Sequence, residues 1–198
     1  MPTACSAGSD PEHCTPPSEF VDTLCNAAFP DATLALFSKG SPWTRAYLRG
    51  DADSWYASGG GSLRARLAFD EEVLVLRVRA PATGGVVVGN GNASYDVLRW
   101  DGLCYTLEAG ELTTKPPPKA KSPPLLFHRY SDATQAALLK DDKVIAARNK
   151  RGKECHGVTT GDVTLACERA DHALGEAVVT YVRTGGALPP PSRFPGSP

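Results

Sequence analysis

The sequence predicts an α+β protein in which a short helix precedes a small β-barrel and a helical hairpin follows it. Three observations support this fold class. Short runs that alternate bulky and polar residues, separated by glycine-containing turns, occupy residues 33–112, which is typical of the strands of a small barrel or sandwich. Apolar residues recur at spacings of three and four positions in residues 163–181, as on one face of a helix. The proline-rich segment 115–124 lies between these regions, and we expect it to be an extended linker.

The composition favours two small modules over one large core. The 198 residues include 19 Gly and 17 Pro, which favours many turns and unstructured stretches. We therefore expect a flexible leader, a short helix with the barrel, the linker, a helical hairpin and a disordered tail, with the respective bounds 1–17, 18–114, 115–124, 125–185 and 186–198.

The charge balance and the hydropathy exclude several classes of protein. Because 21 basic residues are offset by 22 acidic ones and the formal net charge is -1, we expect no nucleic-acid partner. The longest apolar runs, such as residues 73–76, are far shorter than the ~20 residues of a membrane-spanning helix. The composition also differs from that of collagen and of acidic disordered chains.

The first elements are expected to be a helix and two short strands. Ser18 follows two prolines and is suited to be the N-cap of a helix over residues 18–27, with Glu19 in its first turn. Residues 33–37 predict a short strand, and residues 43–49 alternate bulky and polar side chains in the same way.

Later strands have the clearest pattern. Residues 72–79 form the strongest predicted strand of the chain. Residues 95–100 and 103–107 flank Asp101-Gly102 and predict a tight hairpin. An Asp-Gly pair supplies the positive φ angles that a type I′ turn needs.

Two helices are expected after the linker. Ser131 or Asp132 is a suitable N-cap for a helix that runs to about Lys150. The second helix carries the apolar stripe of residues 163–181 and ends at Gly185-Gly186. Neither helix alone buries enough surface to be stable, so we expect a hairpin packed on itself or on the barrel.

The six cysteines suggest an oxidising compartment outside the cytosol. Thr3-Ala4 immediately precedes Cys5, and a stretch containing Ser and Gly follows it. This pattern resembles the end of a bacterial lipoprotein signal, which implies that Cys5 carries a lipid and anchors an exported protein. The alternatives are an unmodified cysteine in a flexible tail and, for the whole chain, a cytoplasmic protein with six reduced cysteines.

The other five cysteines are disulfide candidates. Cys155 and Cys167 flank a turn between two predicted helices, which favours a bond between them. Cys25 is expected to pair either with Cys14 or with Cys104. If Cys5 carries a lipid, one of the five remains without an intramolecular partner.

Two stretches carry a resemblance to a known family. Residues 66–76 combine a polar turn with a strand, and residues 94–107 form an aromatic-led hairpin around Asp101-Gly102. With a closing strand at Glu111-Leu112, residues 64–112 resemble a bacterial Src-homology-3-like (SH3-like) domain, although Cys104-Tyr105 stands where that family commonly has Gly-Trp. The resemblance implies a small SH3-like barrel that binds cell-wall peptides or other proteins and does no chemistry.

The same resemblance implies a set of ligand-binding aromatic residues. Tyr95, Trp100 and Tyr105 would lie near a ligand groove, and Trp55 and Tyr56 would line it from the first loop. Aromatic rings suit such a groove because they offer a rigid contact surface at low entropic cost. The alternative is that these rings pack in the core and at the rim of the barrel.

Residues that could support catalysis or bind a metal lack the spacing that such sites need. The chain has no Cys-x-x-Cys and no His-x-x-x-His, so we expect no metal site and no cofactor. Cys155-His156 could supply a nucleophile and a base. The run Asp70-Glu71-Glu72 could supply an acid pair, but before a strand it is more typical of a charged sheet edge.

A basic cluster lies at the end of the first predicted C-terminal helix. Cations at a helix C-terminus interact favourably with the helix dipole, which explains the cluster without a ligand. The alternative is contact with an anionic surface, such as phospholipid headgroups or a polyanionic envelope polymer. The cluster consists of Arg148, Lys150, Arg151 and Lys153.

Together these observations predict a non-catalytic exported envelope protein, held in the periplasm or at the outer membrane by a lipid anchor. We expect it to bind a cell-wall peptide or an envelope protein through the aromatic-lined SH3-like barrel, and to contact the membrane through the anchor only. One alternative is a structural subunit that oligomerises. The other is a small hydrolase that uses Cys155 or the acid pair.

Overall fold

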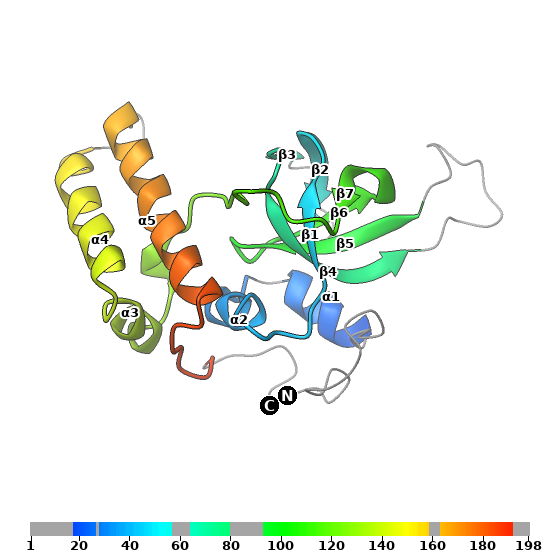
Figure 1. Cartoon of the computed structure of the whole chain (residues 1–198), viewed down its shortest axis with the longest axis horizontal. Coiled ribbons are helices and arrows are strands. Elements are labelled where there is room, and N and C mark those ends of the chain that lie inside the picture. The colour runs from blue at the N-terminus through cyan, green and yellow to red at the C-terminus, as the bar shows by residue number, and fades with distance from the viewer. Residues whose placement is uncertain (1–17, 27, 57–63, 80–92, 159–162, 192–198) are drawn as a thin grey trace. The chain divides into compact units, whose positions relative to one another are not determined.

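The computed structural model describes residues 18–26, 28–56, 64–79, 93–158 and 163–191, and Figure 1 labels their helices and strands. These residues form two compact units. The sheet unit contains the described residues up to Phe29 together with Pro42–Lys121, and the helical unit contains Pro30–Ser41 together with residues 122–191. The predicted leader at 1–17, with Cys5 and Cys14, lies outside the described residues, as do residues 192–198 of the predicted tail.

Helix α1 (Ser18–Asn26) confirms the first predicted helix and belongs to the sheet unit. Its buried face includes Phe20, whose ring stacks on that of Trp43 with the centroids 5.8 Å apart. On the other side, the Asp22 carboxylate pairs with the Arg77 guanidinium at 3.1 Å. Stacking and the ion pair together hold α1 against the sheet.

Seven antiparallel strands form one sheet in the spatial order β3-β2-β6-β5-β4-β1-β7. The strand predicted at 72–79 is confirmed as β4, and the predicted hairpin as β5 and β6. Within the described residues no pairing joins the edge strands β3 and β7, so the sheet is open and the closed barrel that the sequence predicted is not formed. The strands are β1 (Arg45–Leu48), β2 (Ala52–Tyr56), β3 (Arg64–Leu67), β4 (Glu72–Arg79), β5 (Ser94–Arg99), β6 (Cys104–Glu108) and β7 (Leu112–Thr113).

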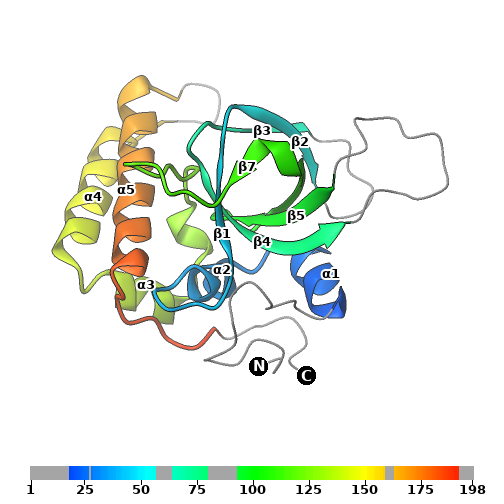
Figure 2. The ribbon, with the colours of Figure 1, turned by 45° about the vertical axis from the view of Figure 1, so that its right-hand side comes forward.

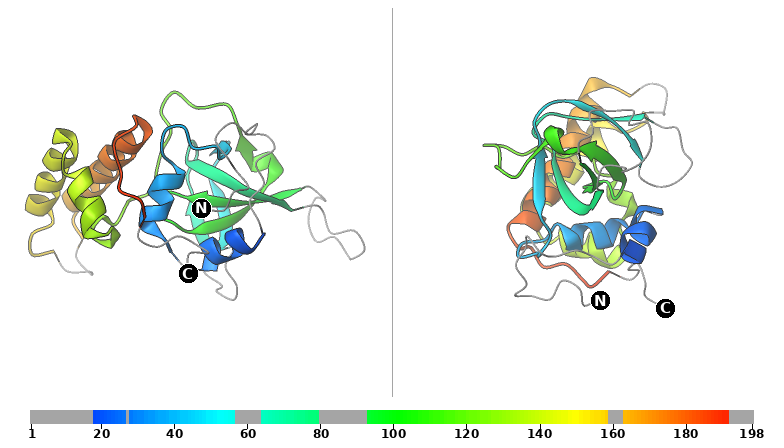
Figure 3. Two further views of the ribbon diagram at one scale, coloured as in Figure 1. Left: turned by 90° about the horizontal axis from the view of Figure 1, so that it is seen from below. Right: turned by 90° about the vertical axis from the view of Figure 1, so that its right-hand side faces the viewer.

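The open sheet is strongly curved, because β1 and β2 are nearly continuous in sequence but distant in the sheet. Residues 49–51 alone separate them along the chain, whereas β4, β5 and β6 lie between them in the sheet. The curvature is visible in Figure 2 and in the right-hand view of Figure 3. The concave side encloses an apolar cluster of Ala46, Leu48, Ala52, Leu67, Val73, Val97, Tyr105, Leu107 and Leu112.

The turn between β5 and β6 differs from the predicted type I′ turn. Gly102 has the positive φ, 83°, that was expected, but Asp101 does not. The Gly102 N–H donates to the Arg99 carbonyl at 3.0 Å, and the Arg99 N–H donates to the Leu103 carbonyl at 2.9 Å. These bonds define a three-residue loop in which an ordinary turn is followed by a left-handed glycine. A single positive-φ residue is therefore enough at this hairpin.

The proline-rich segment 115–124, predicted as a linker, contains no helix, and its Lys121 forms an isolated parallel bridge with Glu71. It follows the short 3₁₀ helix η2 (Ala109–Glu111) and strand β7. Its Lys121 is bonded to the sheet unit: the Lys121 N–H donates to the Asp70 carbonyl at 2.9 Å, and the Lys121 carbonyl accepts from the Glu72 N–H at 3.1 Å. The segment is thus anchored at this residue, beside the start of β4.

Residues 33–37 do not form the predicted strand. They belong to helix α2 (Pro30–Leu36) and its C-terminal end, in the helical unit. Pro30 occupies the first helical position, Asp31 lies in the first turn, and the Phe37 N–H donates to the Thr33 carbonyl at 3.0 Å. The prediction was wrong because a short apolar run that is buried on nearly all sides has no period that distinguishes a strand from a helix.

The predicted helix from residue 131 or 132 to about Lys150 is divided into α3 (Asp132–Leu138) and α4 (Asp142–Glu154). Ser131 is the N-cap of α3, where its hydroxyl accepts from the Thr134 N–H at 3.3 Å. Asp141 begins the next helix, because its carboxylate accepts from the N–H groups of Lys143 at 2.9 Å and Val144 at 3.1 Å.

The second predicted C-terminal helix is confirmed as α5 (Leu165–Arg183). It packs side by side with α4, as Figures 1 and 2 show, and this pair is the predicted C-terminal helical hairpin. The helical unit also contains the 3₁₀ helix η3 (Phe127–Arg129). Its core includes Leu138, Val144, Ala170, Leu174 and Val178.

The left-handed glycine of the β5–β6 hairpin gives a first prediction. We expect Gly102→Ala to lower the free energy of unfolding by about 1–2 kcal/mol, because a side chain at positive φ is strained. The control is Gly50→Ala, where φ is not positive and an added Cβ meets no atom within 4 Å; we expect a change within about 0.5 kcal/mol. Urea denaturation measures both, and equal effects of the two substitutions would contradict the assigned turn.

Candidate functional site

Two disulfides are present in the described residues. Cys155 pairs with Cys167, as the sequence favoured, and Cys25 pairs with Cys104, the second of its two alternatives. Disulfides are typical of an oxidising space outside the cytosol. A sulfur held in a disulfide is not the thiolate that the Cys155-His156 hydrolase hypothesis needs. The sulfurs of Cys155 and Cys167 and a carboxylate oxygen of Asp171 lie within 4.8 Å of one another, but the disulfide prevents both sulfurs from binding a metal ion there.

The carboxylates considered as an acid pair are bonded inside the sheet unit. Glu72 is buried and accepts from Arg45 Nη1 at 2.8 Å and from the Trp100 indole N–H at 2.9 Å. Glu71 is buried as well and accepts from Arg99 Nε and from the Ala68 N–H. Both groups therefore have structural partners that compensate the cost of burying their charge.

A third buried carboxylate, Asp96 on β5, is the most enclosed of the sheet unit. Its side chain is 0% exposed and pairs with Arg77 at 2.7 Å and with Arg79 at 2.9 Å. The Thr106 hydroxyl donates to it at 3.0 Å. Two guanidinium groups and one hydroxyl thus surround this carboxylate, as a buried charge requires.

The predicted ligand-binding aromatic residues are placed differently from one another. Trp100 and Tyr105 are each 1% exposed and pack in the interior instead of lining an open groove. The Arg99 guanidinium lies 5.6 Å from the centroid of the Tyr105 ring. Tyr95 is partly buried and packs against the apolar cluster of the sheet. The interior packing matches the alternative that the sequence left open for these rings.

Trp55 and Tyr56 lie in strand β2 and not in a loop. Their backbones pair with Thr106 and Tyr105 of β6, and Trp55 also pairs with Arg64 of β3. Their side chains lie outside what the structure describes. The five predicted residues are thus on neighbouring strands or in the β5–β6 turn, but those with described side chains do not gather into an aromatic surface.

The helical unit contains a pocket of about 410 Å³, a volume within the ~300–1,000 Å³ of small-molecule sites. Four elements supply its walls: η3, α3, α4 and α5. No acidic residue lines it, whereas three cationic residues do, and two of these extend their side chains into it. Its lining residues are Phe127, His128, Gln135, Arg148, Asn149, Arg151, Gly152, Lys153 and Leu174.

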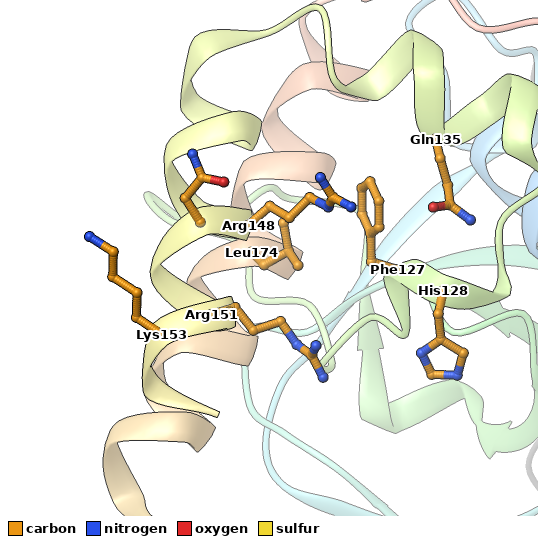
Figure 4. A pocket seen from close by; sticks show the side chains of 9 residues that line it. Phe127, His128, Gln135, Arg148, Arg151, Lys153 and Leu174 are labelled. Carbon is orange, nitrogen blue, oxygen red and sulfur yellow. The ribbon is translucent and has the colours of Figure 1, made fainter. Parts of the chain in front are cut away.

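Two arginines of α4 determine the charge inside the pocket. Arg148 and Arg151 are three residues apart and so lie on one face of the helix. Figure 4 shows both side chains extending toward the wall made by Phe127 and His128, whereas Lys153 points away. The Arg148 guanidinium lies 5.9 Å from the centroid of the Phe127 ring. Among the described residues no carboxylate pairs with Arg148, so none of them neutralises its charge.

The other arginine is held by a neighbouring helix. Arg151 Nε donates to the Asp171 carboxylate of α5, which orients the guanidinium and offsets its charge. Leu174, one turn further along α5, is 1% exposed and contributes an apolar surface to the pocket. A cationic group beside a ring and a leucine suits a ligand with an anionic group attached to a less polar part.

The sequence identified the cations of this pocket but not its other walls. Arg148, Arg151 and Lys153 were recognised as a basic cluster. Phe127 and His128 were missed because η3 is a single 3₁₀ turn at the end of a proline-rich segment, where no periodicity exists to be read. Leu174 was assigned correctly to an apolar helix face, which gives no sign of a pocket.

Comparison with protein-family models, with curated proteins and with solved structures finds no match to this chain. The function of the pocket therefore has to follow from its own chemistry. Of the helices described, none is long and apolar enough to cross a membrane.

The buried carboxylate of β5 gives the second prediction. We expect Asp96→Ala to lower the free energy of unfolding by about 1–3 kcal/mol, because it leaves the Thr106 hydroxyl and the guanidinium groups of Arg77 and Arg79 without their buried acceptor. Arg66→Ala is the control, since Arg66 pairs with Asp51 at 2.9 Å where both side chains are exposed. We expect that control to cost less than about 1 kcal/mol. Chemical denaturation distinguishes the two, and a small effect at Asp96 would contradict the role assigned to it.

Two aspartates with opposite pKa shifts give a prediction on pH. Burial raises the pKa of Asp101 above its ordinary value of 3.8, against the opposing effect of Arg99. Hydrogen bonds from the Phe69 N–H and Arg66 lower the pKa of Asp51 below 3.8. The contribution of Asp101 to stability therefore falls as pH rises from 3.8 through its folded-state pKa, whereas that of Asp51 is complete above 3.8 and is lost as pH falls through its folded-state pKa.

The measurement is the free energy of unfolding of the native chain minus that of each variant, followed over acidic pH. For Asp101→Asn we expect this difference to decrease as pH rises, and for Asp51→Asn we expect it to increase. Slopes of the same sign for both variants would contradict the assigned environments.

Proposed function

We propose that the protein is an exported, non-catalytic binding protein of the bacterial cell envelope, and that it binds an anionic envelope component through the pocket of its helical unit. The observation that carries this proposal is the Arg148 side chain, which extends into a pocket without acidic lining residues and has no carboxylate partner among the described residues. A charge in that position interacts favourably with an anion that enters the pocket.

The placement outside the cytosol rests on the disulfides. The described residues of each unit contain a disulfide, which supports an oxidising environment. Attachment to a membrane through a lipid on Cys5 is the finer part of this proposal. It rests on the residues around Cys5 in the sequence alone.

The absence of catalysis is proposed because the groups that suggested it have structural partners. Cys155 is bonded to Cys167. Glu71 and Glu72 are bonded to arginines inside the sheet unit. Neither arrangement leaves a nucleophile or a general base facing an open pocket, which a hydrolase of either kind needs.

The SH3-like resemblance of residues 64–112 stays a proposal about the origin of the sheet unit. Strand β4 and the hairpin of β5 and β6 lie where the resemblance implies them, which supports it. Binding of a cell-wall peptide or an envelope protein by this unit would have to rely on Tyr95, Trp55 and Tyr56, because Trp100 and Tyr105 are buried. The helical unit is therefore the better-supported place for the binding site.

Co-sedimentation with purified bacterial cell-wall fragments tests the proposed function. We expect the full chain to bind the fragments, and Arg148→Gln to weaken binding by about tenfold or more, because a hydrogen bond to a charged group contributes about 1.5–3 kcal/mol. Binding should also weaken as salt is raised.

The matched control is Lys150→Gln, which removes the same charge from an exposed position on α4 that does not line the pocket. We expect this control to bind nearly as well as the native chain. Equal losses in the two variants would overturn the assignment of the pocket, and no binding to the fragments would exclude the cell wall as the source of its ligand.

A further inference from the structure

We infer that the anionic group which the pocket accepts is a phosphate ester. This inference rests on the proposed function for the location of the site and adds the class of its ligand. It starts from the two arginines of α4, whose side chains extend to the same side of the pocket in Figure 4. Arginine presents a planar fork of N–H donors that matches the oxygens of phosphate, and clusters of arginine are a common way to bind it.

The state of the two guanidinium groups favours an ester of phosphate over a carboxylate. Arg148 lies against the Phe127 ring, which holds the guanidinium without using its N–H donors. Arg151 uses Nε for Asp171, which leaves the two terminal nitrogens for a ligand. Donors on two arginines suit the three or four oxygens of a phosphate better than the two oxygens of one carboxylate.

The remaining walls indicate that the phosphate carries a substituent. A pocket of about 410 Å³ is much larger than a bare phosphate needs. Leu174 and the Phe127 ring offer apolar contact, and Gln135 and Asn149 offer polar contact. These side chains suit a small substituent with both carbon and hydroxyl groups, such as glycerol. The ester could belong to a phospholipid headgroup or to a soluble or polymeric glycerol phosphate.

Titration calorimetry of the full, oxidised chain tests the ligand class. The probes are glycerol 3-phosphate, inorganic phosphate and succinate, which is a dianion without phosphorus. We expect glycerol 3-phosphate to bind about tenfold more tightly than succinate, since its phosphate oxygens can each accept from the two arginines in parallel. Inorganic phosphate should bind more weakly than the ester, because it lacks the substituent.

Two variants distinguish the contribution of the paired guanidinium N–H donors from that of positive charge alone. Arg148→Lys keeps the charge and should weaken glycerol 3-phosphate binding about tenfold, because an ammonium cannot bind two oxygens in parallel. Lys150→Gln loses a charge outside the pocket and should change binding less than about twofold. A thermal unfolding midpoint equal to that of the native chain shows that each variant is folded.

Vesicles identify the source of the ester. If the chain sediments with phosphatidylglycerol vesicles but not with phosphatidylcholine vesicles, and Arg148→Lys abolishes this sedimentation, the ester belongs to a lipid. Binding of glycerol 3-phosphate without vesicle binding places it on a soluble or polymeric compound. Both results support the inference.

Equal affinity for succinate and glycerol 3-phosphate, or no binding of glycerol 3-phosphate, overturns the phosphate ester as the ligand. If cell-wall binding still depends on Arg148 in that case, the proposed function stands and an acidic peptide becomes the ligand class. If glycerol 3-phosphate binds through Arg148 while neither cell-wall fragments nor phosphatidylglycerol vesicles bind, the ligand class stands and the envelope function fails.

Discussion

In the described residues, each compact unit of this protein contains a covalent cross-link between segments that would otherwise depend on a small apolar core. A chain of 198 residues that divides into two units leaves each with limited buried surface, and small exported domains commonly add disulfides for that reason. The Cys25–Cys104 bond joins α1 to the first residue of β6 across 79 residues of sequence. The Cys155–Cys167 bond joins the end of α4 to the first turn of α5. The second of these bonds thus cross-links the α4–α5 pair that carries the pocket.

The sheet unit adds a second source of order, in the form of buried charge. Glu71, Glu72 and Asp96 all lie inside it and each is bonded to at least one arginine. Such pairs contribute little net stability compared with apolar packing, but they penalise any arrangement that separates the partners. The indole of Trp100 belongs to the same system through its bond to Glu72. A ring that the family resemblance places at a binding surface is here used to satisfy a buried carboxylate.

Local patterns in the sequence were sufficient for the elements with a clear period or a clear cap. Strand β4, the β5–β6 hairpin, α1 and α5 all follow from alternation, from Asp101-Gly102 or from a helical stripe. The Cys155–Cys167 bond followed from proximity in sequence. The failure at α2 has the opposite cause: its residues are buried on nearly all sides, so the pattern of apolar residues carries no information about the period.

Contacts between residues far apart in the chain could not be predicted from such local patterns. The pocket depends on Phe127, Gln135, Arg148 and Leu174 coming together from four separate elements. Sequence could show that Arg148 is one of several cations, but not that Lys150 lies outside the pocket. It also could not show that β1 and β2 occupy distant places in one sheet, because this depends on strand pairing between residues far apart in the chain.

The helical unit is built from two stretches of chain, Pro30–Ser41 and residues 122–191, and all strands of the sheet unit lie between them in sequence. The Asp31 carboxylate of α2 accepts from the Ser131 N–H at 3.2 Å, a bond between residues 100 positions apart. A fragment that ends at Lys121 therefore contains α2 without the helices that it packs with. A continuous segment that carries the whole helical unit has to include the strands as well, because Pro42–Lys121 lies between its two stretches. The helical unit therefore cannot be expressed or exchanged on its own as one uninterrupted piece of chain.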